Sequence, residues 1–201
     1  MPALTVVAGG PTTQRDDEQP VFFYDLGSPG CYLVAERIMA VLHPAPEWEP
    51  VHAAALGIAL DPAGRSEIEA AAAGGELQPV RWPEPWPPDT ELAMRAATWA
   101  KRGGRAVAFS LAAFRQAFAG GRDLGDEGTV LIAGAACEMH PTAMLKGITL
   151  KATARAMQAA HARARLAGVT ALPAIAVGER VFCGPGCLEP AATALAATGR
   201  T

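Results

Sequence analysis

Apolar residues recur at two spacings along this chain, and the spacing indicates where strands and helices are expected. A compact apolar run over residues 21–25 predicts a strand that is buried on both faces. From Pro29 to about Leu42 the apolar residues recur at helical spacing, and residues 47–53 alternate as a half-buried strand does. A strand, helix and strand of this length form a βαβ unit, so we expect two parallel strands joined by a right-handed crossover.

Residues 58–149 are expected to be almost entirely helical. The predicted helices cover about Ser66–Ala73, Glu91–Arg102, Arg105–Phe118 and Asp126–Glu138, and a run from Pro141 can continue through Gly147 into 151–167. The segment 79–88 is too rich in proline for a helix or a central strand, so we expect an extended wall. Trp82 and Trp86 in this wall are interpreted mainly as a hydrophobic clasp over the core, and alternatively as an apolar lip over a site.

The end of the chain again has strand character. Gly168 ends the preceding helix as a left-handed C′ glycine does. The run 174–177, the turn Gly178-Glu179 and the run 180–183 predict a hairpin, and a closing helix is expected over 188–197. The predicted order is therefore β-α-β, a helical block, and then α-β-β-α, which is the order of an α/β fold carrying a helical insertion.

Composition narrows the class of protein further. The chain has 201 residues, of which half are apolar and 18% are charged, as is typical of a globular protein with one sizeable core. A net charge of −3, without a Lys/Arg stripe, gives no reason to expect nucleic acid as a partner. No apolar run approaches membrane-spanning length and the N-terminus lacks a signal-peptide pattern, so we expect no membrane partner and a cytoplasmic location. Residues 1–19 are expected to form a mobile tail.

Ser28 begins a predicted helix, and the first turn of that helix is the clearest candidate for chemistry. Ser28 is an N-cap candidate, and Pro29 follows at the first helical position, where a missing N–H costs nothing. The positive end of the helix dipole lies behind the hydroxyl, so a thiolate, carboxylate or oxyanion would be stabilised here. Asp25, just before the turn, is interpreted as structural.

Two stretches resemble the DsbA family of the thioredoxin superfamily, and a third resembles one branch of it. The run 24–32, with Ser28-Pro29-Gly30-Cys31, stands where the family has strand, C-P-x-C or S-P-x-S, and helix. The run 168–174 resembles G-V-x-G-V-P-T, whose proline is cis and faces the active site. The resemblance implies an α/β thioredoxin-like fold with a central sheet of about four strands. Its thioredoxin-like domain would comprise 20–57 and 150–201, and its helical insertion 58–149.

The run 88–95 is similar to the P-x-N-T-x-x-A-x-R segment of one branch, which contains 2-hydroxychromene-2-carboxylate isomerase and the kappa-class glutathione transferases. This similarity implies glutathione or another low-molecular-weight thiol as cofactor, no metal, and thiol-assisted isomerisation or transfer of a small molecule or thiol conjugate. Ser28 would stabilise the thiolate, the Leu172 backbone and cis-Pro173 would fix the thiol's main chain, and Asp89 would orient it. Pro29 and the wall with Trp82 and Trp86 would border the cleft.

The cysteines depart from the dithiol pattern of the family. A hydroxyl at position 28 cannot form a mixed disulfide, so the dithiol cycle is not available there. Cys31 is interpreted chiefly as a small buried core residue, and alternatively as a thiol of low pKa. Gly186 and Cys187 stand where the branch has the Asp and Arg/Ser that hold the γ-glutamyl end of glutathione. Cys183 and Cys187 are interpreted as small residues flanking a turn, or as an accessory thiol pair; with no histidine nearby they make a poor zinc site.

The sequence leaves three functions open. The leading hypothesis is a catalytic protein that holds a small thiol at Ser28. The second is a monothiol disulfide oxidoreductase that uses Cys31. The third is a non-catalytic family member that binds a peptide or small molecule at the Pro173 edge by strand-like pairing. Alanine-rich helix exteriors also favour a homodimer.

Overall fold

The computed structural model describes residues 19–60 and 64–198. The N-terminal tail expected over 1–19 lies outside the described residues, except for Gln19. In the described part of the chain, no helix is both long enough and apolar enough to cross a membrane.

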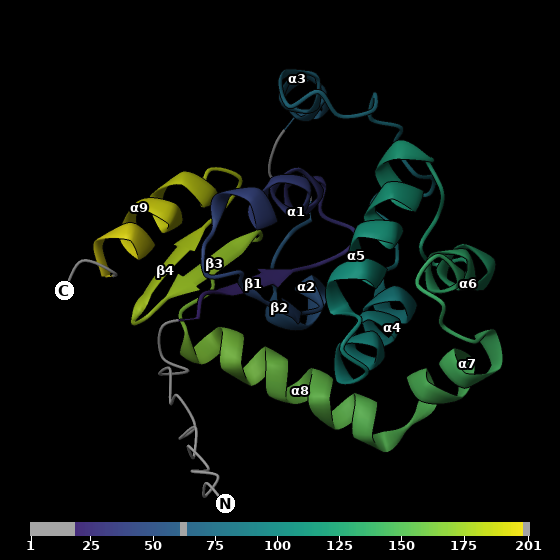
Figure 1. Ribbon diagram of the computed structural model, residues 1–201. Coiled ribbons are helices and arrows are strands. Elements are labelled where there is room, and N and C mark those ends of the chain that lie inside the picture. Colours follow the sequence, from purple (N-terminus) through teal and green to yellow (C-terminus); the bar gives the residue numbers. More distant parts are fainter. Residues whose placement is uncertain (1–18, 61–63, 199–201) are drawn as a thin grey trace, which may run out of the picture.

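One mixed sheet forms the centre of the fold (Figure 1). Its strands are β1 (Val21–Tyr24), β2 (Glu47–Pro50), β3 (Ala174–Val177) and β4 (Arg180–Cys183). The spatial order is β2-β1-β3-β4, with β1 parallel to β2 and antiparallel to β3, and with β3 antiparallel to β4. The parallel pairing confirms the predicted βαβ unit, and β1 is central because strands from both ends of the sequence pair with it.

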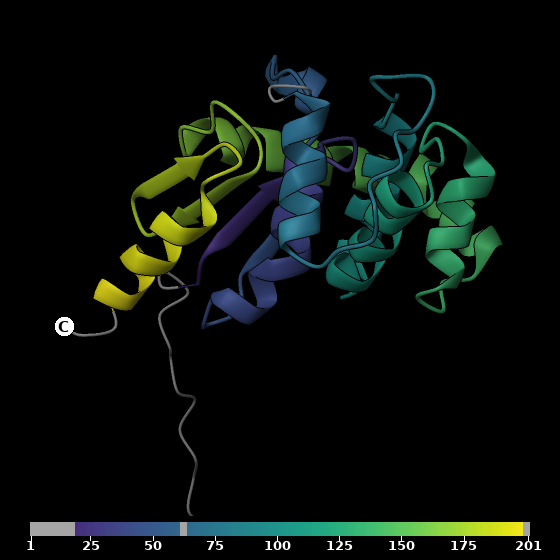
Figure 2. The same ribbon diagram turned by 90° about the horizontal axis from the view of Figure 1, so that it is seen from above.

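The helices fall into layers around this sheet. They are α1 (Pro29–Val41), α2 (Ala53–Leu56), α3 (Arg65–Gly74), α4 (Glu91–Arg102), α5 (Ala106–Phe114), the π-helical turn η2 (Arg115–Ala119), α6 (Glu127–Ala135), α7 (Pro141–Thr149), α8 (Lys151–Leu166) and α9 (Leu188–Thr198). Figures 1 and 2 show α1 and α9 on one face of the sheet and α8 along the other. Helices α4 to α7 gather beyond the β2 edge, and α3 packs on α1.

Aromatic residues of β1 join the sheet to the helical block. Every residue of β1 is buried. Phe22 and Tyr24 both contact Trp48 of β2, with ring centroids 5.1 and 5.5 Å apart. The Tyr24 ring also lies 5.9 Å from Phe114, and its hydroxyl shares a hydrogen bond of 2.6 Å with Ser110. The core is therefore continuous from the sheet into α5.

Local sequence signals predicted several elements well. Helix α4 has the predicted bounds, and the hairpin of β3 and β4 turns at Gly178 as expected. Gly168 has a φ of +81°, and the N–H of Val169 reaches back to the Ala164 carbonyl, so the predicted left-handed helix end is confirmed.

Other bounds were wrong, and tertiary contacts account for two of them. The strand expected over 47–53 ends at Pro50, because the Ala53 N–H is taken by the Asp25 carboxylate and α2 begins there. The run from 141 to 167 is two helices that meet at the extended Leu150. The Thr153 hydroxyl donates to the Gly147 carbonyl across this break. The helix expected over 105–118 changes to π-helical geometry at Arg115, and the helix expected to reach Glu138 ends at Ala135.

Candidate functional site

Ser28 caps the N-terminus of α1 as the sequence predicts. Its hydroxyl oxygen accepts a hydrogen bond of 3.3 Å from the Cys31 N–H, and its own N–H donates to the Asp25 carbonyl at 3.1 Å. The oxygen is thus held by the backbone, and the Ser28 side chain also lies within hydrogen-bonding reach of the Cys31 thiol. Because a hydroxyl rotates, its hydrogen can be donated to that thiol or to a ligand. Ser28 is only 2% exposed, so only a small part of its side chain is open to a ligand.

Asp25 holds the turn that presents Ser28. One carboxylate oxygen accepts from the Gly27 N–H at 2.9 Å and the other from the Ala53 N–H at 2.8 Å. Burial raises the pKa of Asp25, against the opposing effect of the hydrogen bonds from Ala53 and Gly27. Both oxygens have partners from the fold itself, which agrees with the structural role that the sequence suggested.

The Leu172–Pro173 peptide bond is cis and lies beside the start of α1. A Cβ added to Gly30 would lie 3.2 Å from Pro173 Cδ and 3.7 Å from Pro185 Cγ, so the helix start and the two prolines are in close contact. The Pro173 carbonyl accepts from the Gly184 N–H at 2.8 Å, which ties the turn after β4 to the same corner. Residues from the start of α1, the strand entry at 173 and the 184–186 turn therefore converge.

The backbone of Leu172 is the second polar feature of this corner. Leu172 is 3% exposed, and within the part of the chain that the structure describes its N–H and C=O form no hydrogen bond. Buried backbone groups are nearly always paired in native proteins. An extended ligand main chain alongside residue 172 would supply the missing donor and acceptor.

A cavity of about 440 Å³ adjoins the Gly27 side of the Ser28 turn. It is lined by His52, Ala54, Ile58, Ala59, Leu60, Pro87, Pro88, Asp89 and Thr90. A Cβ on Gly27 would lie 2.6 Å from Thr90 Cγ2 and 3.1 Å from both Leu60 and Pro88, so the turn forms part of the cavity border. Asp89 is exposed at this cavity, and its Oδ1 accepts from the Glu91 N–H at 3.0 Å.

Thr90 adds an unsatisfied hydroxyl to the same cavity. Its Oγ1 is buried and has no hydrogen bond of standard geometry among the described residues, although the hydroxyl lies close enough to Asp25 to favour the ionised carboxylate. The sequence analysis gave Thr90 no role. A ligand group with a hydrogen-bond donor or acceptor would give this oxygen a partner.

Trp82 and Trp86 make the contacts expected of a clasp. Their rings meet edge to face with centroids 5.0 Å apart, and the Arg65 guanidinium of α3 lies 4.9 Å from the Trp82 ring. The Trp82 indole N–H donates to Glu69 at 2.7 Å, and both rings approach Phe118 of η2. These contacts anchor α3 to the helical block, while a contact of either tryptophan with a ligand stays a prediction.

The thiols near the corner are shielded. Cys31 is fully buried, and burial raises the pKa of its thiol in spite of the hydrogen-bonding contributions of the Ser28 side chain and the Asp25 backbone. This confirms its interpretation as a small core residue and weighs against a reactive thiolate at this position. Burial, together with the nearby Cys183, raises the pKa of Cys187 to about 12. Both Cys183 and Cys187 are free thiols, so their role as an accessory pair stays a prediction.

A metal site was not expected. Among residues 19–60 and 64–198, no group of three or more His, Cys, Asp or Glu side chains is placed to hold a metal ion.

The sheet order, together with a cis-proline beside a capped helix start, defines a thioredoxin-fold protein with additional helices. The sequence model of the DSBA-like thioredoxin domain matches residues 21–196. The chain therefore belongs to the DSBA-like thioredoxin domain family.

Solved structures agree with this fold at low sequence identity. 2-Hydroxychromene-2-carboxylate isomerase is 15% identical with a TM-score of 0.78, and the match covers 90% of this chain and 96% of the isomerase. A probable DsbA oxidoreductase from Streptomyces coelicolor is 19% identical with a TM-score of 0.72, covering 92% and 91%. A DsbA variant from Pseudomonas aeruginosa is 14% identical with a TM-score of 0.61, covering 94% and 91%. No curated protein matches the chain.

Three contributors to the site had no role there in the sequence analysis. Pro185 contacts the Gly30 position, Leu60 borders Gly27, and Thr90 brings a buried hydroxyl to the cavity. The Gly184-Pro185-Gly186 run after β4 predicts a turn, but its contact with the start of α1 depends on the tertiary fold. No local pattern indicates Leu60.

Proposed function

We propose that this member of the DsbA-like oxidoreductase and isomerase family binds a small thiol at Ser28 and uses it in isomerisation or transfer. The observation that carries the proposal is the Ser28 hydroxyl, fixed at the N-terminus of α1 beside the unpaired Leu172 backbone. A hydroxyl donor and the positive end of a helix both stabilise a thiolate over a thiol.

Each part of the corner has a separate task in this proposal. The Ser28 hydroxyl donates to the ligand sulfur, and the N–H and C=O of Leu172 pair with the main chain of the thiol-bearing residue. Asp89, exposed at the adjoining cavity, receives a donor group of the ligand. The co-substrate of the thiol occupies the cavity of about 440 Å³, whose lining is mainly apolar and includes Pro88 and Leu60.

The γ-glutamyl end of glutathione would find fewer binding groups at positions 186 and 187 of this chain than in the branch it resembles. Gly186 carries no side chain and Cys187 is buried, so neither supplies a charge for the amino group of a γ-glutamyl moiety. The residues that remain recognise the thiol and its adjacent backbone. The proposal therefore extends to low-molecular-weight thiols as a class, with glutathione as one of them.

Isothermal titration with glutathione and with free cysteine tests the proposal. We expect saturable binding to at least one, weakened about ten- to a hundredfold by Ser28→Ala, as for a lost hydrogen bond to a charged group. Ser66→Ala, at an exposed position on α3, is the matched control and should bind as the unaltered protein does. Absence of binding to every thiol tried would overturn the proposal.

Cys31 offers no support for the monothiol alternative, because its thiol is buried and its pKa is raised. A disulfide substrate would have to reach a sulfur that lies behind Ser28 and the first turn of α1.

A further inference from the structure

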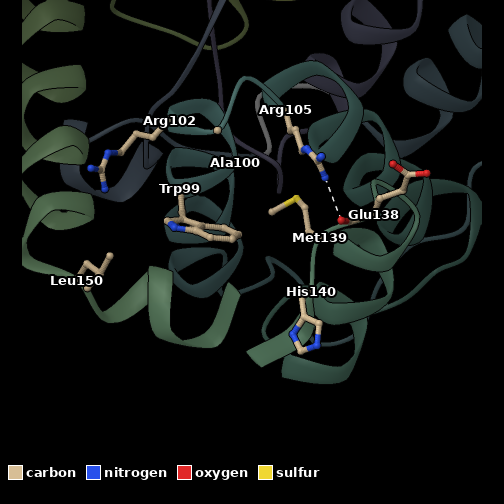
Figure 3. Close-up of a pocket in the computed structure, with 9 residues that line it drawn as sticks. Trp99, Ala100, Arg102, Arg105, Glu138, Met139, His140 and Leu150 are labelled. Atoms are coloured by element: carbon tan, nitrogen blue, oxygen red, sulfur yellow. Dashed lines mark hydrogen bonds between the residues drawn. The ribbon is translucent and has the colours of Figure 1, made fainter. Parts of the chain in front are cut away.

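A second cavity, of about 390 Å³, opens at the far end of α4. It is lined by Trp99, Ala100, Arg102, Gly103, Arg105, Glu138, Met139, His140 and Leu150 (Figure 3). Helix α4 has twelve residues, which corresponds to a length of about 18 Å. Asp89, beside the first turn of α4, belongs to the candidate thiol site, so the two cavities are separated by the length of this helix.

The apolar wall of the cavity is Trp99, Met139 and Leu150. Trp99 is held in place, because its indole packs directly on the backbone of Gly147, where an added Cβ would collide with the ring. Met139 is nearly buried, whereas Leu150, at the break between α7 and α8, is 47% exposed. A flat apolar group could stack on the indole and cover the exposed leucine.

The polar side of the cavity is predominantly cationic. In Figure 3 the guanidinium groups of Arg102 and Arg105 flank Trp99 and Met139, and the Glu138 carboxylate lies beyond Arg105 as seen from Trp99. Arg105 is oriented by the helix end, since its NH1 donates to the carbonyls of Cys137 and Glu138 at 2.7 and 2.9 Å. His140 precedes α7 without using its side chain to cap that helix.

Arg102 is the cation that remains available to a ligand. Arg102 is the exposed last residue of α4, and within the described part of the chain it forms no ion pair or side-chain hydrogen bond. The neighbouring Lys101, in contrast, is paired with Glu47 and Glu49. Guanidinium groups recognise carboxylates with paired hydrogen bonds in a fixed geometry. An aromatic ring, an apolar floor and an unpaired guanidinium together match a planar aromatic carboxylate.

We propose that this cavity is a second binding site, separate from Ser28, for a planar aromatic anion of one or two rings. The ring stacks on Trp99 and contacts Met139 and Leu150, and the carboxylate meets Arg102, with Arg105 adding positive charge. The volume lies within the usual range for small-ligand pockets, about 300–1,000 Å³. The proposal does not depend on the thiol function.

Titration calorimetry with 2-naphthoate and with its uncharged counterpart 2-naphthylmethanol tests the site. We expect saturable binding of naphthoate and about tenfold weaker binding of the alcohol, because a charge-assisted contact is lost. Arg102→Gln should weaken naphthoate binding by a similar factor, and Trp99→Phe should weaken both compounds. Arg122→Gln, at an exposed arginine outside this cavity, is the matched control and should leave binding unchanged.

Three results would overturn the proposal: no saturable naphthoate binding, equal affinity for acid and alcohol, or no effect of Arg102→Gln. Ser28→Ala separates the two sites, since it should leave naphthoate binding intact. Loss of naphthoate binding in Ser28→Ala would place the probe in the thiol site and would also overturn the second site.

Discussion

At the scale of single residues, Ser28 places a hydroxyl, which is a hydrogen-bond donor, at the start of α1. Its oxygen is held by the Cys31 N–H, and its hydroxyl stands at the positive end of α1. A hydroxyl in this place can lower the pKa of a bound thiol but cannot form a disulfide itself. The proposed function therefore assigns Ser28 to the binding of an external thiol and not to exchange with a protein disulfide.

The burial of Cys31 leads to a prediction about alkylation. In the folded protein, iodoacetamide should modify the half-buried Cys183 and Cys137 before the buried Cys31 and Cys187. Peptide mapping by mass spectrometry over a time course measures the order. Rapid modification of Cys31 would contradict the shielded thiol and would revive the monothiol hypothesis. Alkylation after unfolding in urea provides the control, since all four thiols should then react.

Local sequence signals could predict those residues near Ser28 and Pro173 whose roles depend on their neighbours in the sequence. Ser28 and Pro29 form a cap signal, and Pro173 follows a run that resembles the family's cis-proline segment. Thr90 and Pro185 contribute through contacts with Asp25 and Gly30, which are distant in the sequence. No periodicity encodes such contacts, because they depend on how the helical block docks on the sheet.

At the scale of elements, ion pairs tie β2 to the helices on either side of it. Lys101 of α4 reaches Glu47 and Glu49 at 2.7 and 2.6 Å, and Arg163 of α8 reaches the same two carboxylates at 2.8 and 2.6 Å. Partial burial works to raise the pKa of Glu47, but the hydrogen bonds and charges of Lys101 and Arg163 outweigh it and hold the pKa below its ordinary value. The network thus fixes α4 and α8 against the edge strand.

Lys101→Ala should lower the free energy of unfolding by about 1–3 kcal/mol, between the values for surface and buried ion pairs, because the nearly buried Glu49 loses a partner. Urea unfolding measures the change. Arg37→Ala is the matched control: it breaks the exposed pair with Glu189 and should cost less than about 1 kcal/mol. Equal effects of the two substitutions would show that the network adds nothing beyond a surface pair.

Element boundaries could be predicted where a cap or a glycine ends a helix, as at Gly103 and Gly168. They could not be predicted where a tertiary contact interrupts a continuous pattern. The pattern through Leu150 reads as one helix, but Trp99 packs on Gly147 and the Thr153 hydroxyl takes the Gly147 carbonyl. The chain therefore turns at a position with no glycine or proline.

At the scale of the whole molecule, the order of the predicted elements indicated an α/β fold with a helical insertion, because a βαβ unit and a later hairpin can share one sheet only in a few ways. The thioredoxin-like fold itself was implied by the resemblance to the DsbA family. The division into a thioredoxin-like domain and the insertion 58–149 stays a prediction. The contacts of α4 with β2, α7 and α8 show that the helical block and the sheet are packed together.

We expect His161 to make the free energy of unfolding sensitive to mild acid. Its Nε2 accepts a hydrogen bond of 3.0 Å from the His52 N–H, which joins α8 to the start of α2, and burial lowers the pKa of His161 below 6.5. Below pH 6.5 the unfolded chain gains a proton that the folded side chain does not take up. Stability is therefore full above this pH and falls as the pH drops towards the folded pKa, by at most about 1.4 kcal/mol per pH unit for this group.

Urea unfolding at a series of pH values measures this dependence. His161→Gln should flatten the curve in this range, whereas His140→Gln, at an exposed histidine, should leave its shape unchanged. A curve for His161→Gln that is parallel to that of the unaltered protein would assign the acid sensitivity to other groups.

The central claim is that Ser28 and the start of α1 stabilise a bound thiolate. The most direct measurement is the pH dependence of the ultraviolet thiolate absorbance of a saturating small thiol, taken as a difference spectrum with and without protein. We predict that the bound thiol ionises at a lower pH than the free thiol, and that Ser28→Ala moves the transition back towards the free value. A bound thiol with the pKa of the free one, or a shift that Ser28→Ala leaves unchanged, would contradict the claim.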